Sequence, residues 1–286
     1  MKNIKVSFCI VVYNHEKYIE NAIESVCYQN FSGSRELIIG VDKSNDATLK
    51  VLEEALRKFS FGGDVTLIEH ETNVGACENY RAVHNMARGD FIAHLDGDDY
   101  FSSELKTQKQ LDIFEKYNNV SVVFTGREGE EYDKDRAVPA VIYKRYVSLL
   151  RRRPGGDLHS SKMYRRKSSF HIPATDFLDK EMHMIHSYEH DICYIAEPLT
   201  FYRPSTGVSK HRNLVRRLFR RALKNCAYMF NKRERNFLEF MIYAELLTDL
   251  KSSGNRSRLT MLMQTRLKSN YLVFLKLLKL KITGSK

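Results

Sequence analysis

The 286-residue sequence lacks several features that would each assign it to a particular class of protein. No stretch approaches the roughly 18 uncharged apolar residues that a membrane-spanning helix needs. The five cysteines are scattered, odd in number and never spaced as CxxC, which argues against a disulfide framework or a zinc site. They are typical of the reduced thiols of a cytoplasmic protein. No internal repeat is present, and the hydrophobic and charged fractions, 43% and 28%, are those of an ordinary globular chain.

The N-terminus resembles a signal peptide only in its basic start. The apolar run at 6–13 is short, and the polar residues 14–17 follow it without a small-residue cleavage site. We therefore expect a buried strand at this position.

Acidic residues are scarce in the last part of the chain. Residues 205–286 contain 19 Lys and Arg against four acids, a net charge of +15, whereas the whole chain carries +11 and residues 1–204 therefore carry −4. The composition shifts after Tyr202-Arg203-Pro204, where helical basic segments begin. We expect a domain boundary near residues 205–212, with the main domain at 1–204 and a basic helical extension at 205–286.

The first half of the main domain alternates between strand-like and helix-like segments. The first expected strand, 6–12, is a continuous apolar run rich in β-branched residues, as in a strand buried on both faces. Further strands are expected at 36–41, 65–70, 91–95 and 120–125. The expected helices cover 17–29, 46–59, 77–87 and 105–117. This repetition predicts a mostly parallel sheet with helices on both faces. The pattern loosens from 127 to 157, where we expect an insertion or loop, and order returns at 160–167, in a helix near 176–187 and in a strand at 192–201.

Polar clusters follow three of the expected strands. Tyr13-Asn14-His15 ends the first, Asp42 ends the second, and Asp96-Gly97-Asp98-Asp99 ends the fourth. In open α/β sheets, ligands bind beyond the carboxyl ends of the strands. The sequence therefore predicts that these clusters share one rim.

The acidic cluster at 96–99 indicates a divalent cation. Three carboxylates within four residues repel one another unless a cation neutralises them. Hard oxygen ligands suit Mg²⁺ or Mn²⁺, whose remaining positions commonly take substrate phosphates. Gly97 lets the backbone turn closely under a ligand. The alternative is a solvated acidic turn, since Asp and Gly are common turn residues.

Several spaced motifs resemble one known family. They are Val6 to Asn14, Glu36 to Asp42 followed by Ser44, Asp46 and Thr48, Asn73-Val74-Gly75 with Asn79, Gly89 to Ile92, and Leu95 to Asp99. In this order they resemble family 2 of the inverting glycosyltransferases, densely over residues 4–125 and more loosely to about 209. The resemblance implies the α/β GT-A fold of nucleotide-diphospho-sugar transferases. It also implies Mn²⁺- or Mg²⁺-dependent transfer of a sugar, from a UDP-sugar in preference, to a hydroxyl of a glycan or lipid-linked glycan, as in surface polysaccharide synthesis.

The resemblance also carries residue roles to this sequence. It implies that Val11, Tyr13, Asn14, Asp42 and Asn79 bind the nucleotide. Asp96 and Gly97 would face the sugar nucleotide, and Asp98 and Asp99 would ligate the metal. The chain departs from the family at 41–43, where Val41 precedes the single Asp42 and Lys43 replaces the usual glycine, which leaves the choice of nucleotide open.

On the acceptor side, the family's catalytic base is an aspartate at the start of the helix before the last strand of the domain. Asp179 matches that position and Asp176 is a rival, and either could instead cap the helix. His159 and Ser160 resemble residues that line the acceptor side, though a lone histidine can equally be structural. Arg203 could pair with the diphosphate or pack beneath a loop.

The basic extension mixes Lys and Arg with bulky apolar residues, as at 216–221 and 272–281. That composition is typical of an amphipathic helix at a membrane surface, and a lipid-linked acceptor favours it over nucleic acid. We therefore expect a cytoplasmic protein, peripheral on the inner face of the cell membrane. Helices docked on the main domain are the alternative. A degenerate scaffold and a nucleotidyltransferase are less favoured, because the acidic cluster is intact and no glycine-rich basic loop follows the first strand. Nothing in the sequence indicates an oligomeric state.

Overall fold

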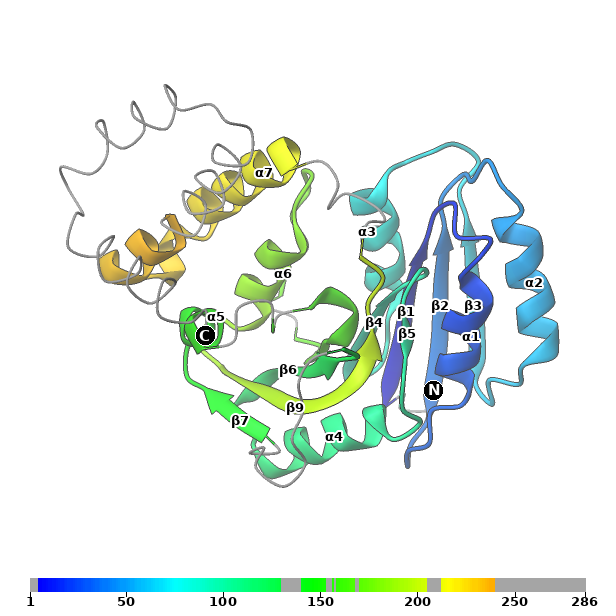
Figure 1. Cartoon of the computed structure of the whole chain (residues 1–286), viewed down its shortest axis with the longest axis horizontal. Coiled ribbons are helices and arrows are strands. Elements are labelled where there is room, and N and C mark those ends of the chain that lie inside the picture. Colours follow the sequence, from blue (N-terminus) through cyan, green and yellow to red (C-terminus); the bar gives the residue numbers. More distant parts are fainter. Residues whose placement is uncertain are drawn as a thin grey trace. The chain divides into compact units, whose positions relative to one another are not determined.

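The computed structural model describes residues 5–129, 140–152, 156, 158–167, 170–204 and 212–239. The chain divides into two compact units, residues 1–231 and 232–286. The fold of the first unit is drawn in Figure 1 and positions every residue discussed below.

The centre of the first unit is a mixed, mostly parallel sheet flanked by helices. Its strands follow the order β3-β2-β1-β4-β8-β6-β9-β5, with β7 paired to β9. The strands are β1 (Val6–Val12), β2 (Arg35–Val41), β3 (Asp64–Glu69), β4 (Phe91–Asp96), β5 (Tyr100–Phe101), β6 (Val120–Arg127), β7 (Ala140–Tyr143), β8 (Met163–Arg165) and β9 (Asp191–Phe201).

The half of the sheet formed by β3, β2, β1 and β4 is entirely parallel. Beyond β4 the sheet becomes mixed, because the short β8 lies antiparallel between β4 and β6 while β6 and β9 are parallel. The pairing of β6 with β9 shifts register around Gly126, and such irregularities bend a strand. Figure 1 shows β9 as a long curved strand that reaches β7.

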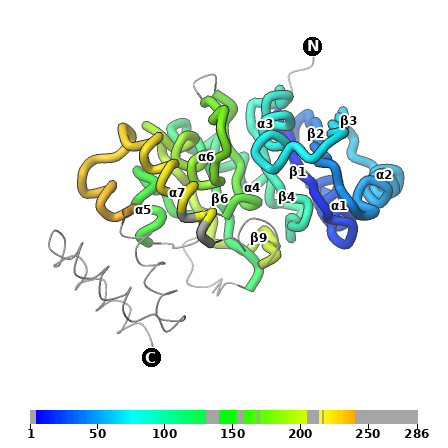
Figure 2. Tube along the Cα trace, turned by 90° about the horizontal axis from the view of Figure 1, so that it is seen from above, coloured from blue at the N-terminus to red at the C-terminus, as the bar shows by residue number. Residues whose placement is uncertain are grey.

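Helices cover both faces of the sheet. The helices are α1 (Ile19–Cys27), α2 (Thr48–Lys58), α3 (Ala76–Met86), α4 (Lys106–Lys116), α5 (Tyr146–Arg152), α6 (Asp179–His186), α7 (Arg212–Asn225) and the 3-10 turns η1 (His159–Ser161) and η3 (Ala227–Met229). Seen from above, α1 and α2 lie on one face of the parallel strands and α3 on the other (Figure 2). The main apolar core lies on the α1 and α2 face, where Phe8, Leu37 and Ile23 are fully buried.

The expected α/β architecture is confirmed, and the expected strands and helices of the first half occur within a few residues of their predicted ends. The expectation of a loose segment at 127–157 was wrong in part, because β7 and α5 form within it. The antiparallel strands β5 and β8 also make the sheet more mixed than the βα repetition alone predicted.

The start of the basic extension packs on the main fold. Leu218, Phe219 and Ala222 of α7 are buried, and Asn225 donates a hydrogen bond to Glu181 of α6 at 2.8 Å. The apolar side of α7 is therefore covered, and the first compact unit runs to Asn231, past the boundary expected near residues 205–212. Residues 240–286, including the amphipathic segment 272–281, lie outside the described residues. Among those described, no helix is long and apolar enough to cross a membrane.

Lys106 is a buried charge that makes stability depend on pH. Its side chain is fully buried at the start of α4, its ammonium lies 4.0 Å from the centre of the Phe101 ring, and it donates to Gln110 Oε1 at 2.9 Å. Burial lowers the pKa of Lys106 from 10.5 to about 7. Between these values the unfolded chain holds a proton that the folded chain has lost, so this residue's contribution to stability rises with pH over that window.

Replacing Lys106 with methionine should therefore stabilise the protein near neutral pH. The variant no longer desolvates an ammonium, at the cost of about 1 kcal/mol for the lost hydrogen bond to Gln110. We expect a net gain on the order of 2 kcal/mol at pH about 7 that shrinks toward pH about 10. Urea unfolding at both pH values measures it, and a gain that is the same at both would show that Lys106 does not titrate on folding.

Candidate active site

The acidic segment 96–99 lies where β4 leaves the sheet, at the carboxyl ends of the parallel strands. The backbone N–H of Gly97 donates to the carbonyl oxygen of Val11 on β1 at 2.9 Å, which holds the segment against the neighbouring strand. A Cβ at position 97 would lie 2.8 Å from Nδ1 of His15 and 3.1 Å from Val12. A side chain at position 97 would therefore displace His15 or Val12, and the predicted turn of Gly97 under a ligand stays a prediction.

Asp99 joins three parts of the chain. It is buried, its Oδ1 accepts a 2.7 Å hydrogen bond from the backbone N–H of Arg203, and its Oδ2 accepts one from Ser160 at 2.5 Å. Arg203 in turn donates from Nε to the carbonyl oxygen of Asp98 at 3.1 Å and stacks over Tyr18 at 4.0 Å. Both oxygens of Asp99 thus serve to connect β4, η1 and the end of β9. Ser160, expected on the acceptor side, lies among the aspartates.

Asp98 has a different environment from Asp99. Within the described ranges, the ionic neighbour of its carboxylate is His15, whose Nε2 lies 3.9 Å away and so beyond hydrogen-bond range. The side chain of Asp98 is 12% exposed. The side chain of Asp96, two residues earlier, is a third exposed. Its Oδ1 lies 3.1 Å from His94 Nε2, and its Oδ2 lies 3.2 Å from the Ser160 hydroxyl. Asp96 is thus the more exposed of the two, but Asp98 is the aspartate whose carboxylate accepts no hydrogen bond from the described residues, so its oxygens are the most available to a ligand.

The charges of this segment are poorly compensated by the protein. Burial raises the pKa of Asp96 above its usual range, although His15, Ser160 and Lys162 act in the opposite direction. Burial and then the charge of Asp96 raise the pKa of Asp99 to about 8. A cation at this rim would relieve both effects, and an all-oxygen donor set suits Mg²⁺ or Mn²⁺, which need one or two carboxylates when substrate phosphates complete their coordination. The residues present therefore fit a divalent metal.

Two further groups of potential metal ligands lie behind the rim. In the part of the chain that the structure describes, His94, Asp96 and His159 form one group, and His159, Asp179 and His183 form the other. The ligand atoms in each group lie within 4.8 Å of one another. Neither group contains Asp98 or Asp99. His159 belongs to both, so its ring lies close to the carboxylates of both Asp96 and Asp179.

Lys162 occupies the space beside His159. It is fully buried, and its Nζ lies 3.2 Å from His159 Nδ1, which is itself 3.2 Å from His183 Nε2. Burial lowers the pKa of Lys162 to about 7, while the charges of Asp179 and Asp96 raise it. Sequence reasoning did not select Lys162, because lysine is among the residues least expected in a core.

The two candidates for the catalytic base differ in their surroundings. Asp179 is the first residue of α6, is half-buried, and shares the group with His159 and His183. Asp176 is exposed three residues earlier. Only Asp179 is thus brought into the cluster behind the rim.

The second strand end is held together by Asp42. This buried carboxylate accepts hydrogen bonds from the backbone N–H groups of Val74 and Gly75, both at 2.8 Å. Gly75 has φ of +84°, a conformation that favours glycine, and it precedes α3. Asp42 therefore anchors the loop before α3, and its contact with a nucleotide stays a prediction.

The other residues predicted to bind nucleotide have mixed surroundings. Tyr13 is 39% exposed beside Asn14, whose Oδ1 accepts a hydrogen bond from the N–H of Asn45 at 2.8 Å. Asn79 is buried on α3, donates to the carbonyl oxygen of Gly40 at 2.9 Å and contacts His70 at 3.3 Å. Asn79 thus ties α3 to β2, whereas Tyr13 remains accessible at the rim.

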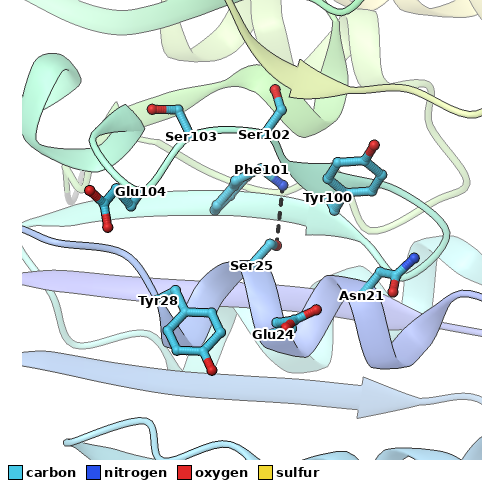
Figure 3. A pocket seen from close by; sticks show the side chains of 9 residues that line it. All are labelled: Asn21, Glu24, Ser25, Tyr28, Tyr100, Phe101, Ser102, Ser103 and Glu104. Carbon is cyan, nitrogen blue, oxygen red and sulfur yellow. Dashed lines mark hydrogen bonds between the residues drawn. The ribbon is translucent and has the colours of Figure 1, made fainter.

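A separate pocket of about 300 Å³ lies between α1 and the segment that follows Asp99 (Figure 3). Glu24 of α1 and Tyr28 at the end of α1 face Tyr100 and Glu104. Ser25 accepts a hydrogen bond from the N–H of Phe101 at 3.1 Å. None of the residues predicted to bind donor, acceptor or metal lines this pocket.

Comparison with known proteins supplies a family. The family model described as Glycosyl transferase family 2 matches residues 7–171. An uncharacterized protein of Mycobacterium tuberculosis is 29% identical over 213 residues, which are 69% of this chain and 58% of that protein. The chain thus spans little more than half the length of this relative.

Two solved structures have a similar fold. The Staphylococcus aureus poly(ribitol-phosphate) beta-N-acetylglucosaminyltransferase TarS is 30% identical over 168 residues, which are 57% of this chain and 28% of TarS. The structure of TarS residues 1–349 in complex with UDP-GlcNAc aligns with a TM-score of 0.62 at 17% identity, over 82% of this chain and 70% of that one. A Pyrobaculum calidifontis mannosyltransferase in complex with GDP-Man and Mn²⁺ aligns with a TM-score of 0.61 at 12% identity, over 92% and 81%.

Proposed function

Because this chain belongs to glycosyltransferase family 2, we propose that it transfers a sugar, with inversion, from a nucleotide-diphosphate donor to a hydroxyl of a glycan or lipid-linked glycan. The observation that carries this proposal is the convergence of two carboxylates on one histidine. Asp96, at the end of β4, and Asp179, at the start of α6, each have an oxygen within 4.8 Å of a ring nitrogen of His159. A sugar nucleotide held at Asp96 and an acceptor hydroxyl held at Asp179 would therefore lie next to each other.

The donor side is formed by the rim. Asp98 would hold Mn²⁺ or Mg²⁺, with Asp99 as a second candidate ligand, and Asp96 would contact the sugar nucleotide. When bound, the metal neutralises the charge that develops on the leaving diphosphate. Tyr13, Asn14 and Val11 lie at the end of β1 beside this segment and would contact the nucleotide, and Arg203 would add its positive charge to that of the metal.

The acceptor side is formed by α6 and η1. An inverting displacement needs a base that takes the proton of the attacking hydroxyl within hydrogen-bond distance. We assign this role to Asp179, because its neighbours His159, His183 and Lys162 connect it to the donor side. The new bond forms between the acceptor oxygen and the anomeric carbon as the bond to the diphosphate breaks, and the proton moves to the Asp179 carboxylate.

The donor proposed is a UDP-sugar. TarS, whose structure holds UDP-GlcNAc, resembles this chain both in sequence and in fold, and the rim residue Asp42 matches a position that the family uses near the base. The acceptor proposed is a growing surface polysaccharide or a lipid-linked glycan. Association with a membrane surface, for which the basic composition of residues 205–286 is the support, would keep such an acceptor close.

A panel of sugar nucleotides tests the donor. We expect UDP-GlcNAc or UDP-Glc with Mn²⁺ to raise the melting temperature by several degrees, since a ligand at about 100 times its Kd stabilises the folded form by about 2.7 kcal/mol. EDTA should remove this rise in melting temperature. GDP-Man and dTDP-Glc, tested in the same way, are the alternative donors for comparison. Greater stabilisation by GDP-Man would refute the choice of nucleotide, and no stabilisation by any of them would refute the proposed function.

A further inference from the structure

A chain of buried hydrogen bonds ends on the donor-side carboxylate. The hydroxyl of Tyr164 on β8 lies 2.7 Å from Nδ1 of His84 on α3. The Nε2 atom of His84 lies 2.9 Å from Nδ1 of His94 on β4, and Nε2 of His94 lies 3.1 Å from Oδ1 of Asp96. Tyr164, His84 and His94 are 4%, 5% and 0% exposed, so water does not compete for these groups.

The strand and helix geometry explains why these side chains meet. Residues two apart on a strand point to the same face, so His94 lies directly below Asp96 on β4. That face is the one covered by α3, which supplies His84 opposite His94 (Figure 2). An apolar residue at position 94 would suit a buried strand equally well, but it would remove the N–H that faces Oδ1 of Asp96.

When the Asp96 carboxylate is ionised, the hydrogen bonds from Tyr164 to Asp96 can be donated in only one direction. An ionised Asp96 only accepts, so His94 must carry its proton on Nε2 and accept at Nδ1. His84 must then also carry its proton on Nε2, and Tyr164 donates to His84 Nδ1. Burial lowers the pKa of both histidines well below 6.5, which is consistent with a neutral ring at each position.

We infer that His94 is a positioning residue, held in its Nε2–H tautomer by His84 and Tyr164, that fixes the Asp96 carboxylate toward the sugar nucleotide. Ser160 does not replace it. The single hydroxyl proton of Ser160 has a nearer acceptor in Asp99 Oδ2 at 2.5 Å than in Asp96 Oδ2 at 3.2 Å. His94 therefore holds Oδ1 of Asp96 and leaves Oδ2 for the sugar nucleotide. The inference rests on the proposed function insofar as Asp96 contacts the donor.

Two substitutions of His94 test this positioning role, because one removes the N–H that faces Asp96 and the other retains an N–H. His94→Leu removes the N–H, and we expect the affinity for a UDP-sugar with Mn²⁺ to fall about 10- to 100-fold, the range for a lost hydrogen bond to a charged group. His94→Gln can present an amide N–H close to the position of Nε2 and should restore affinity to within a few-fold. The control is His186→Leu, since His186 is equally buried and stacks on Tyr164 with ring centroids 3.8 Å apart, yet lies outside the chain of hydrogen bonds. Equal binding by His94→Leu and His186→Leu would overturn the inference.

A second measurement uses the unliganded wild-type protein and depends neither on donor binding nor on folding of the variants. Nitrogen-15 NMR of histidine-labelled protein distinguishes the two tautomers of a neutral ring. We expect both His84 and His94 to be protonated on Nε2 alone. A proton on Nδ1 of His94, or a charged ring, would overturn the inference. If the tautomers are as expected but no sugar nucleotide binds, the hydrogen-bonded chain stands and the proposed function fails.

Discussion

Replacing Asp98 with alanine is expected to reduce metal-dependent sugar transfer about 1000-fold while leaving the fold intact. Asp98 is the aspartate of the rim whose carboxylate the protein uses least, with His15 at 3.9 Å as its ionic neighbour. Its loss leaves at the rim the carboxylates of Asp96 and Asp99, which already accept hydrogen bonds from the protein. Electrostatic stabilisation of the leaving diphosphate by a metal contributes several kcal/mol to a barrier. Release of UDP from a UDP-sugar, measured with Mn²⁺ and with EDTA, gives the rate.

The control for Asp98 is Asp64→Ala. Asp64 is an exposed acid at the opposite, N-terminal end of β3 and contacts Arg88 at 3.2 Å. We expect this variant to keep wild-type activity and to keep the rise in melting temperature that Mn²⁺ and UDP-sugar produce together, whereas Asp98→Ala should lose that rise. If Asp98→Ala is as active as Asp64→Ala, the metal is held elsewhere, and Asp99 or the histidine groups become the candidates.

The parallel half of the sheet was predictable because its signal is local. β1 and β2 are short runs rich in β-branched residues, and β1, β2 and β4 are each buried on both faces, so the sequence shows little alternation. The missed elements have weaker local patterns. β7 has only four residues beside a charged stretch, and β5 and β8 have two and three. Their positions are set by pairing with β9, β4 and β6, which no local pattern reveals.

The rim was predictable because the carboxyl ends of neighbouring parallel strands meet at one edge of the sheet, but the hydrogen-bond partners of its residues were not. Asp42 lies at the predicted strand end, yet its oxygens accept N–H groups of Val74 and Gly75, more than 30 residues away. Ser160 and Arg203 were expected near different parts of the substrate, and both meet at Asp99. A motif locates a residue on an element, whereas its contacts depend on segments that are distant in the sequence.

The buried cluster behind the rim shows the limit most clearly. His159 lies in η1 and Lys162 directly follows that turn. His94 comes from β4, and His183 comes from α6. Charged and imidazole side chains are usually exposed, so neither composition nor periodicity selects them as buried partners. One signal was available: His94 stands two residues before Asp96, on the same face of a predicted strand.

Replacing Asp179 with asparagine is expected to lower the turnover number for transfer about 100- to 10,000-fold, the contribution typical of a general base. Asparagine keeps the size of the side chain and its capacity to accept a hydrogen bond from the N–H of Lys180, which Asp179 Oδ1 accepts at 2.8 Å. The start of α6 should therefore be preserved. The affinity for the donor should stay within a few-fold of the wild type, because Asp179 acts on the acceptor hydroxyl and the donor binds at the rim. Steady-state kinetics with a hydroxyl acceptor, together with calorimetry of donor binding, separate the two quantities.

Asp176→Asn is the matched control, since it makes the same chemical change three residues earlier on an exposed side chain. We expect it to retain most of the transfer activity. The reverse result, with Asp176→Asn inactive and Asp179→Asn active, would identify Asp176 as the base and would require the segment before α6 to move toward His159 when substrates bind. Loss of donor binding in Asp179→Asn would instead show that Asp179 belongs to the donor side, and that its proximity to His159 and His183 serves to hold the sugar nucleotide and not to accept a proton.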